Sequence, residues 1–398
     1  MKKVILTILL LTAGLVAQAQ DKKEEGIKFT DTKTIPCTSI KDQYRSGTCW
    51  CFSGVGYLES EILKASGKEI DLSEMWLVRN LYFEKVVKYV RLHGSLNLEQ
   101  GGGLDEVLYA AKKYGVVPEE VYHGHNYGTE KPEFGELIEI LKSYAKAVVS
   151  NRNRKLTTAW MNGLNGILDA YFGPRVEEFT YQGKQYTPTT FLESLPIKTS
   201  DYISLTSFTH HPFYEKFIIE IPDNWLWQEV YNVTMDEMMQ VIDSAMEQGY
   251  AVLWGTDVSE KGFNRQKAIG VIPQEDVESL EGTDAAHWNK LSATEKNALI
   301  YGLKAPVKEK QITQEMRQKA FDNYETTDDH GMIIIGTATD QAGHPFYKVK
   351  NSWGVRKPYD GYYYFSRPFV QYKTIDIMVN KKAVSKEILK KLKVSLAK

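Results

Sequence analysis

The segment from Gln43 to Ser53 places the strongest constraint on what this chain can fold into. It puts a glutamine six residues before a cysteine, Cys49, from which a helical pattern begins. The apolar residues of that pattern recur at steps of three and four positions: Phe52, Val55, Leu58 and Ile62. Gly67 follows where a C-terminal cap is expected, and the charged face carries Glu59, Glu61 and Lys64. The sequence therefore predicts a helix that presents Cys49 in its first turn.

Cys49 and Gln43 supply two parts of a site for thiol acyl transfer. The backbone N–H of Cys49 and the side-chain amide of Gln43 can stabilise an oxyanion between them. The positive end of the helix dipole favours the thiolate, which is the reactive form of cysteine. A lone cysteine at a helix start is more often a small buried residue, so this interpretation depends on a base and an orienting group elsewhere in the chain.

Candidates for both groups stand near the other end of the sequence. His330 begins an apolar β run, and Asn351 follows the next predicted strand, Pro345 to Lys350. If these strands pair antiparallel, the two side chains meet, and the amide of Asn351 fixes the tautomer of the imidazole. Trp353 is placed to cover that hydrogen bond from water.

These residues resemble the catalytic elements of the papain-like cysteine peptidases: Gln43, Cys49-Trp50, His330 and Asn351-Ser352-Trp353-Gly354. Leu72 to Val78 resembles the second helix of that family. Gly102-Gly103-Leu104 is similar to the glycine pair whose main chain cradles the peptide substrate.

The resemblance implies both a fold and a chemistry. The fold is α+β with two lobes, a helical N-terminal lobe and a C-terminal lobe rich in antiparallel β-structure, enlarged by helical insertions. The chemistry is hydrolysis of peptide bonds by a cysteine, histidine and asparagine, in which a thiolate and an imidazolium form an ion pair. The substrate would lie against Gly102, Gly103 and Trp353, and no metal or organic cofactor is needed.

The distance between the motifs points to one branch of this family. His330 follows Cys49 by 281 positions, against roughly 130–150 in ordinary papain-like enzymes. The enlarged chain resembles the bleomycin hydrolase and aminopeptidase C group, in which the last residues enter the cleft and restrict cleavage to free N-termini. Here the final basic segment, Ser385 to Lys398, looks shorter than that arm. The resemblance implies an aminopeptidase, whereas the short tail favours an endopeptidase with an open cleft.

Two other functions use the same fold. A non-catalytic binding protein is expected to have lost part of the site, and every catalytic residue type is present here. Acyl transfer to an amine in place of water uses the same three residues, and the mass of the product distinguishes it from hydrolysis.

The first residues are typical of an export signal. Lys2 and Lys3 precede an apolar run from Val4 to Val16, and Ala17-Gln18-Ala19 is a small-x-small cleavage site. The run is too short to span a bilayer. We therefore expect residues 1–19 to be a cleaved signal peptide, no membrane span afterwards, and a protein that is secreted or resides in a bacterial periplasm.

The rest of the chain divides into three regions. A helical lobe with the nucleophile covers 20–122, a partly helical insertion covers 123–205, and a β-rich lobe with the histidine and asparagine covers 206–398. The last region holds a second insertion at 259–323 and the basic C-terminal tail. Helices are expected at 105–114, 235–248 and 313–321, two more within 132–170, and a hairpin at 176–188.

Composition argues against nucleic acid as a partner. With 42% hydrophobic and 25% charged residues the chain is an ordinary globular protein, and its formal net charge of −2 predicts no binding to nucleic acid. Peptides are the expected partners, and the family resemblance implies a homo-oligomer, a hexamer. The three cysteines leave a Cys37–Cys51 disulfide open as an alternative, with Cys49 free.

Two histidine pairs raise the question of a metal site. They are His123 with His125, and His210 with His211. No cysteine or carboxylate nearby in the sequence completes a ligand set, so the sequence predicts no metal.

Overall fold

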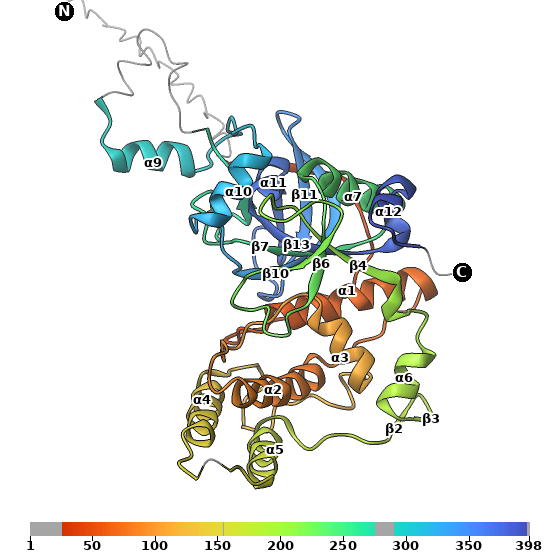
Figure 1. The fold of residues 1–398 in the computed structure, drawn as a ribbon. Helices are drawn as coiled ribbons and strands as arrows, with labels where there is room; N and C mark the ends of the chain where they lie inside the picture. Colours follow the sequence, from red (N-terminus) through yellow and green to blue (C-terminus); the bar gives the residue numbers. More distant parts are fainter. Residues whose placement is uncertain (1–25, 154, 275–289, 396–398) are drawn as a thin grey trace, which may run out of the picture.

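The computed structural model describes residues 26–153, 155–274 and 290–395, which form two lobes (Figure 1). One lobe consists of helices, the other is built around a large sheet, and helix α1 (Cys49–Ser66) lies between them. The predicted combination of a helical lobe and a β-rich lobe is confirmed.

The helical lobe packs around α1 and carries most of the first insertion. Its helices are α2 (Glu74–Arg91), α3 (Glu106–Tyr114), α4 (Gly135–Val149), α5 (Ala159–Phe172) and α6 (Pro188–Ser194). The predicted hairpin is present as β2 (Phe179–Tyr181) and β3 (Lys184–Tyr186), and the two helices expected within 132–170 are α4 and α5. Ser73 begins α2 by accepting a hydrogen bond from the backbone N–H of Trp76.

Helix α1 begins at Cys49 and is followed by Gly67 in the left-handed conformation, as the sequence predicts. Its charged face is not a solvent face, because α1 packs between α2 and α3 on one side and the sheet on the other. Glu59 is fully buried and accepts hydrogen bonds from Thr38 Oγ1 at 2.6 Å and from the backbone N–H of Leu72 at 2.9 Å. These internal donors replace the water that a buried carboxylate loses.

The β-rich lobe is organised on a mostly antiparallel sheet. Its order is β5-β6-β4-β13-β7-β10-β11-β12-β9-β8, and β1 also pairs with β10. The strands are β1 (Phe29–Thr34), β4 (Tyr202–Thr206), β5 (Lys216–Ile218), β6 (Glu229–Asn232), β7 (Val252–Thr256), β8 (Phe263–Asn264), β9 (Ile269–Gly270), β10 (His330–Asp340), β11 (Pro345–Lys350), β12 (Tyr362–Ser366) and β13 (Thr374–Asn380).

Two strands lie where the sequence does not place them. β1 comes from the region assigned to the helical lobe, yet it pairs antiparallel with β10, with Phe29 opposite Asp340. β4 comes from the end of the first insertion, yet it pairs with β13, with Tyr202 opposite Asn380. Strand partners far apart in the chain are decided by tertiary packing, which a local pattern does not encode.

Helices and short connections complete the β-rich lobe. They are α7 (Met235–Gln248), α9 (Ala293–Tyr301), α10 (Gln314–Asp322), α11 (Arg367–Lys373), α12 (Lys386–Lys391) and the 3-10 turns η1 (Thr199–Asp201) and η2 (Lys381–Ala383). α7 has the predicted bounds, and a capping box formed by Thr234 and Glu237 begins it. Within the described residues no helix is both long and apolar enough to cross a membrane.

The basic tail packs beside α7 as far as it is described. Lys391 of α12 forms an ion pair with Glu237 at 2.8 Å, and Ser244 Oγ donates to the backbone carbonyl of Ala383 at 2.8 Å. In Figure 1, α12 lies towards the end of the molecule where α1 stops, and Cys49 lies at the opposite end of α1.

Candidate active site

Cys49 is the first residue of α1, and it is partly exposed. Its backbone N–H is one of the first-turn donors that an α-helix leaves without an internal acceptor. The backbone N–H groups of Gly331 and Trp50 lie near the Cys49 sulfur, and both act to lower the pKa of its thiol. A side chain at Gly331 would place its Cβ 2.7 Å from Ser53 Oγ, so glycine there lets β10 approach the first turn of α1.

This close approach brings the start of β10, where His330 precedes Gly331, to the first turn of α1. His330 Nε2 lies 2.8 Å from Asn351 Oδ1, and the amide oxygen accepts the N–H. The register that pairs Ile333 with Lys350 brings the start of β10 and the end of β11 together, as predicted. The hydrogen bond to Nε2 leaves Nδ1 as the nitrogen available to the thiol.

Trp353 covers this pair of residues. Its ring stacks on the imidazole of His330 with centroids 4.6 Å apart and an interplanar angle of 28°. The guanidinium of Arg265 lies over Trp353 at 4.4 Å from the ring centroid. Trp353 thus shields the hydrogen bond between His330 and Asn351 from water, the place that the sequence predicts for it.

Gln43 is buried and its amide is held at both ends. Its Oε1 accepts a hydrogen bond from Ser352 Oγ at 2.6 Å, and its Nε2 donates to the backbone carbonyl of Ser46 at 2.8 Å. The primary amide keeps a second N–H for a substrate oxygen. Ser352 is a positioning residue to which sequence reasoning assigns no role, although it stands inside the recognised Asn351–Gly354 motif.

Burial acts on both reacting groups. It raises the pKa of the Cys49 thiol to about 12, against the hydrogen bond from Gly331, and it lowers the pKa of His330 to about 4, against the hydrogen bond to Asn351. The ion pair implied by the family resemblance is therefore not favoured by burial of either group alone. Transfer of the proton from sulfur to imidazole would make two opposite charges, and their attraction would offset part of this cost.

The glycine segment beside the cleft is supported from below by buried polar groups. Lys85 donates to the carbonyls of Glu99 and Gly101, each at 2.7 Å. The backbone N–H of Gly103 donates to Glu106 Oε1 at 2.9 Å, and a Cβ on Gly102 would lie 2.5 Å from Glu106 Oε2. Glycine at position 102 therefore makes room for the Glu106 carboxylate.

Comparison with known families adds to this geometry. The model of the papain family of cysteine proteases matches residues 27–167, and that of the peptidase C1-like family matches residues 300–397. The first match contains Gln43 and Cys49, and the second contains His330 and Asn351. The chain belongs to the papain-like cysteine peptidases.

Relatives of this papain-like peptidase match it over most of its length. It is 22% identical to aminopeptidase C of Streptococcus thermophilus, over 88% of this chain and 82% of the relative. It is 23% identical to aminopeptidase G of Lactobacillus delbrueckii subsp. lactis, over 91% of this chain and 86% of the relative. The crystal structure of PepW from Lactobacillus rhamnosis has a similar fold, with a TM-score of 0.66 at 19% identity over 92% of this chain and 84% of that one.

This papain-like peptidase also has two carboxylates near the nucleophile that belong to no sequence motif. Asp328 and Asp223 are both half-buried, and both lie close enough to Cys49 for their charges to raise the pKa of its thiol further. Asp223 Oδ2 lies 1.8 Å from where a Cβ on Gly101 would be, so this carboxylate packs directly on the glycine segment. The only sequence signal at either residue is that Asp328 comes two positions before the base.

The cysteines of this peptidase are all free, so the alternative of a Cys37–Cys51 disulfide is not realised. Cys51 is fully buried, and its thiol lies 3.4 Å from the carbonyl of Glu74, to which it donates. Cys49 is thus the one partly exposed thiol on the first turn of α1.

Proposed function

We propose that this papain-like cysteine peptidase is an aminopeptidase, which removes residues from the free N-terminus of peptides. The observation that carries the proposal is the pair of carboxylates, Asp223 and Asp328, whose charges both act on the Cys49 thiol. An aminopeptidase must hold an α-ammonium group close to the nucleophile, and carboxylates are the side chains that bind it with charge-assisted hydrogen bonds.

Asp223 is positioned to meet the start of a bound peptide. Its Oδ1 accepts a hydrogen bond from Asn97 Nδ2 at 3.0 Å, which fixes the carboxylate against Gly101. Asp328 lies in the same lobe as Asp223, immediately before the strand that carries His330. Burial, together with the charge of Asp223, raises the pKa of Asp328 to about 8, and a bound cation would remove that penalty.

Two further acidic groups lie behind the glycine segment, and burial raises the pKa of both, that of Glu106 to about 8. Glu106 Oε2 is buried and accepts no hydrogen bond within the described residues. Glu106 and Asp376 line one small cavity together with Gly103 and Leu104. The charge of Lys85 and the backbone N–H of Gly103 favour the ionised form of Glu106 against this burial.

The catalytic steps follow from the geometry of the four site residues. His330 takes the proton of Cys49, and the sulfur attacks the carbonyl carbon of the first peptide bond. The second N–H of Gln43 and the backbone N–H of Cys49 stabilise the oxyanion. His330 then gives its proton to the leaving amine, and water activated by the same imidazole releases the acyl group as the free amino acid.

The decisive experiment compares peptides of one sequence with free and acetylated N-termini, digested by the mature chain and by Cys49→Ala and followed by mass spectrometry. We expect stepwise loss of single residues from the free peptides only. Asp223→Asn and Asp328→Asn should each raise KM for free peptides about tenfold, the cost of one charge-assisted hydrogen bond. Asp236→Asn, which removes an exposed carboxylate on α7, is the matched control and should leave KM unchanged.

The position of the tail favours a second candidate, an endopeptidase. The described part of the tail packs on α7, and α12 lies away from the Cys49 end of α1 (Figure 1). Internal cuts irrespective of acetylation would establish this candidate and overturn the first. Ligated products would indicate acyl transfer to amines, and equal peptide patterns from wild type and Cys49→Ala would indicate a binding protein.

We further propose that the protein is exported and oligomeric. Export is supported by Lys2, Lys3, the apolar run and the Ala17-Gln18-Ala19 site, which lie outside the described residues. N-terminal sequencing of the protein from the periplasm or medium should begin after Ala19, and retention of Met1 would contradict export. Light scattering of the mature chain should give a multiple of the monomer mass, and a monomer would contradict oligomerisation.

A further inference from the structure

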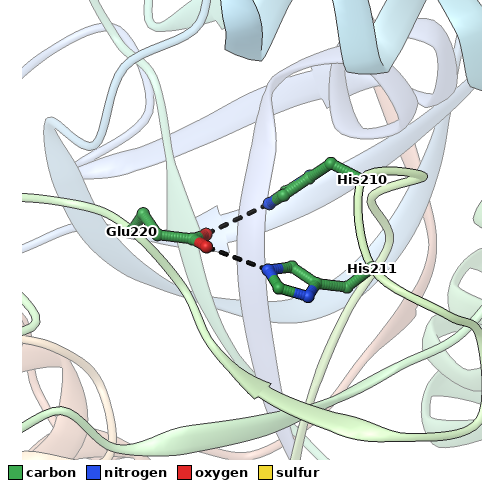
Figure 2. A group of neighbouring side chains, drawn as sticks. All are labelled: His210, His211 and Glu220. Atoms are coloured by element: carbon green, nitrogen blue, oxygen red, sulfur yellow. Dashed lines mark hydrogen bonds and ion pairs between the residues drawn. The ribbon is translucent and has the colours of Figure 1, made fainter.

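We propose that His210, His211 and Glu220 form a binding site for a zinc-type divalent cation, separate from the catalytic residues. Figure 2 shows the two imidazoles converging on the one carboxylate. His210 Nε2 lies 3.1 Å from Glu220 Oε2, and His211 Nε2 lies 2.9 Å from Glu220 Oε1. Within the described residues, one ligand atom from each of the three side chains lies within 4.8 Å of the others.

The structure supplies the carboxylate that the sequence lacks near these histidines. Glu220 is nine positions beyond His211, and the chain returns through β5 to bring it back. Two ligands of a tetrahedral zinc, each about 2.0–2.1 Å from the ion, stand about 3.3 Å apart. The nitrogen–oxygen distances here are a few tenths of an ångström shorter, so small side-chain rotations open the site.

Both imidazole rings are held by aromatic neighbours. The ring of His211 stacks on Phe217 with centroids 4.3 Å apart at 22°, and the ring of His210 stacks on Phe321 at 5.7 Å and 20°. The loop behind them is pinned by the buried Asn232, whose Nδ2 donates to the carbonyls of Phe208 and His211 at 2.7 and 2.9 Å. The ligands are therefore largely pre-organised, which lowers the entropy cost of binding.

Gln318 provides the outer partner that metal-bound histidines usually have. Its Nε2 lies 3.1 Å and its Oε1 3.4 Å from His210 Nδ1, and Oε1 also accepts a hydrogen bond from the backbone N–H of Thr209. With Nε2 on a metal, Nδ1 carries the proton and donates it to this oxygen. Gln318 Nε2 donates to Asp322 Oδ1 at 2.8 Å, which fixes the orientation of the amide.

The donor set selects the class of cation. Two imidazole nitrogens and one carboxylate suit zinc and its neighbours among the transition metals, whereas magnesium and calcium prefer oxygen ligands throughout. His210 and Glu220 are exposed, so the ion can enter from solvent and water can complete its coordination.

A cation here would act on the cleft through one short segment. Ile219 and Ile221, on either side of Glu220, line the same cavity as Gly103 and Asp376. Asp223 follows two residues after Ile221 and packs on the glycine segment. A cation would tie Glu220 to His210 and His211, which follow β4. It would therefore restrict the motion of the segment that carries Asp223.

The test measures zinc binding by the untagged mature chain with Cys49→Ala, since the catalytic thiol itself binds zinc. Equilibrium dialysis with zinc alone should give one ion per chain. His211→Ala and Glu220→Gln in this background should each weaken binding at least about tenfold, and Gln318→Ala about tenfold. His123→Ala removes a histidine that also pairs with a glutamate, at 3.2 Å from Glu119, and should leave binding unchanged.

Hydrogen exchange gives a second readout that needs no peptidase activity. Zinc should slow exchange of the backbone amides from 208 to 223, and Glu220→Gln should abolish that protection. Equal zinc binding by the parent protein and the ligand variants, or zinc binding without protection of this segment, would overturn the proposal. Because the catalytic cysteine is absent, neither result depends on whether the enzyme is an aminopeptidase.

Discussion

Two of the places where histidine meets a polar partner in this protein are built in opposite ways. His330 is buried, and its partner is the neutral amide of Asn351. His210 and His211 lie at the surface and share the carboxylate of Glu220. An amide orients an imidazole without adding charge, whereas a carboxylate brings a negative charge that a bound cation can balance. The partner, more than the histidine, determines the chemistry of each site.

The largest effect expected from this comparison is the loss of the base. His330→Ala should lower kcat by about 10⁴-fold or more, because Cys49 then has no group to take its proton. Steady-state kinetics on a free-amine peptide, with circular dichroism to check the fold, measure this loss. His344→Ala removes another histidine hydrogen-bonded to a carboxylate, Asp340 at 2.8 Å, and should keep full activity; an equal loss in both variants would contradict the role of His330.

Removal of the oxyanion donor should come next. Gln43→Ala should lower kcat by about 10²–10³-fold with little change in KM, because the amide acts on the charge that develops in the transition state. Ser352→Ala should cost less, since Ser352 only holds Gln43 Oε1. A rise in KM at constant kcat would show instead that Gln43 binds the ground state.

The comparison can be tested by giving His330 a carboxylate partner, as Glu220 is for His210 and His211. Asn351→Asp places a carboxylate on the imidazole, and an opposite charge favours the protonated ring, so the pKa of His330 should rise. The neutral imidazole that accepts the thiol proton then persists only at higher pH. The acidic limb of the kcat/KM profile should move upward relative to wild type, and an unmoved limb would contradict this role for Asn351.

The smallest expected effect is on the stability that Glu220 gains from its hydrogen bonds with His210 and His211. Burial raises the pKa of Glu220, but hydrogen bonds from His211 and His210 outweigh it and lower that pKa overall. A lowered folded-state pKa stabilises the fold above the unfolded value, about 4.3, and this contribution disappears as the pH falls through the folded value. With EDTA present, Glu220→Gln should lower Tm by about 1–2 °C at pH 7 and by less at pH 3. An equal difference at both values would contradict the linkage.

The positions of the candidate catalytic residues could be predicted because each depends on a local sequence pattern. A helix start, a strand start and a strand end place Cys49, His330 and Asn351, and the pairing of β10 with β11 follows from their adjacency in the chain. Helix α7 is equally local, since a capping threonine and a terminal glycine bound it.

The remaining features depend on contacts between distant segments. Glu59 has the sequence of an exposed glutamate and is buried only because α1 lies between two lobes. Asp223 and Asp328 belong to no motif, and only the closed fold brings them both to Cys49. Glu220 reaches His210 and His211 through a strand that has its own pairing requirements. Residue spacing alone predicts none of these contacts.

The pairing of β1 with β10 has a consequence for how the chain is made. Position 29 lies opposite position 340, and β10, the strand on which position 340 lies, also carries the base. Contacts with such long sequence separation form late, because the chain must first be available and then close a large loop. A ribosome or a translocation channel therefore releases a polypeptide whose thiol is present before its base is in place. The cell that synthesises the enzyme handles an inert chain, and the catalyst comes into existence only when folding joins its first strand to its last lobe.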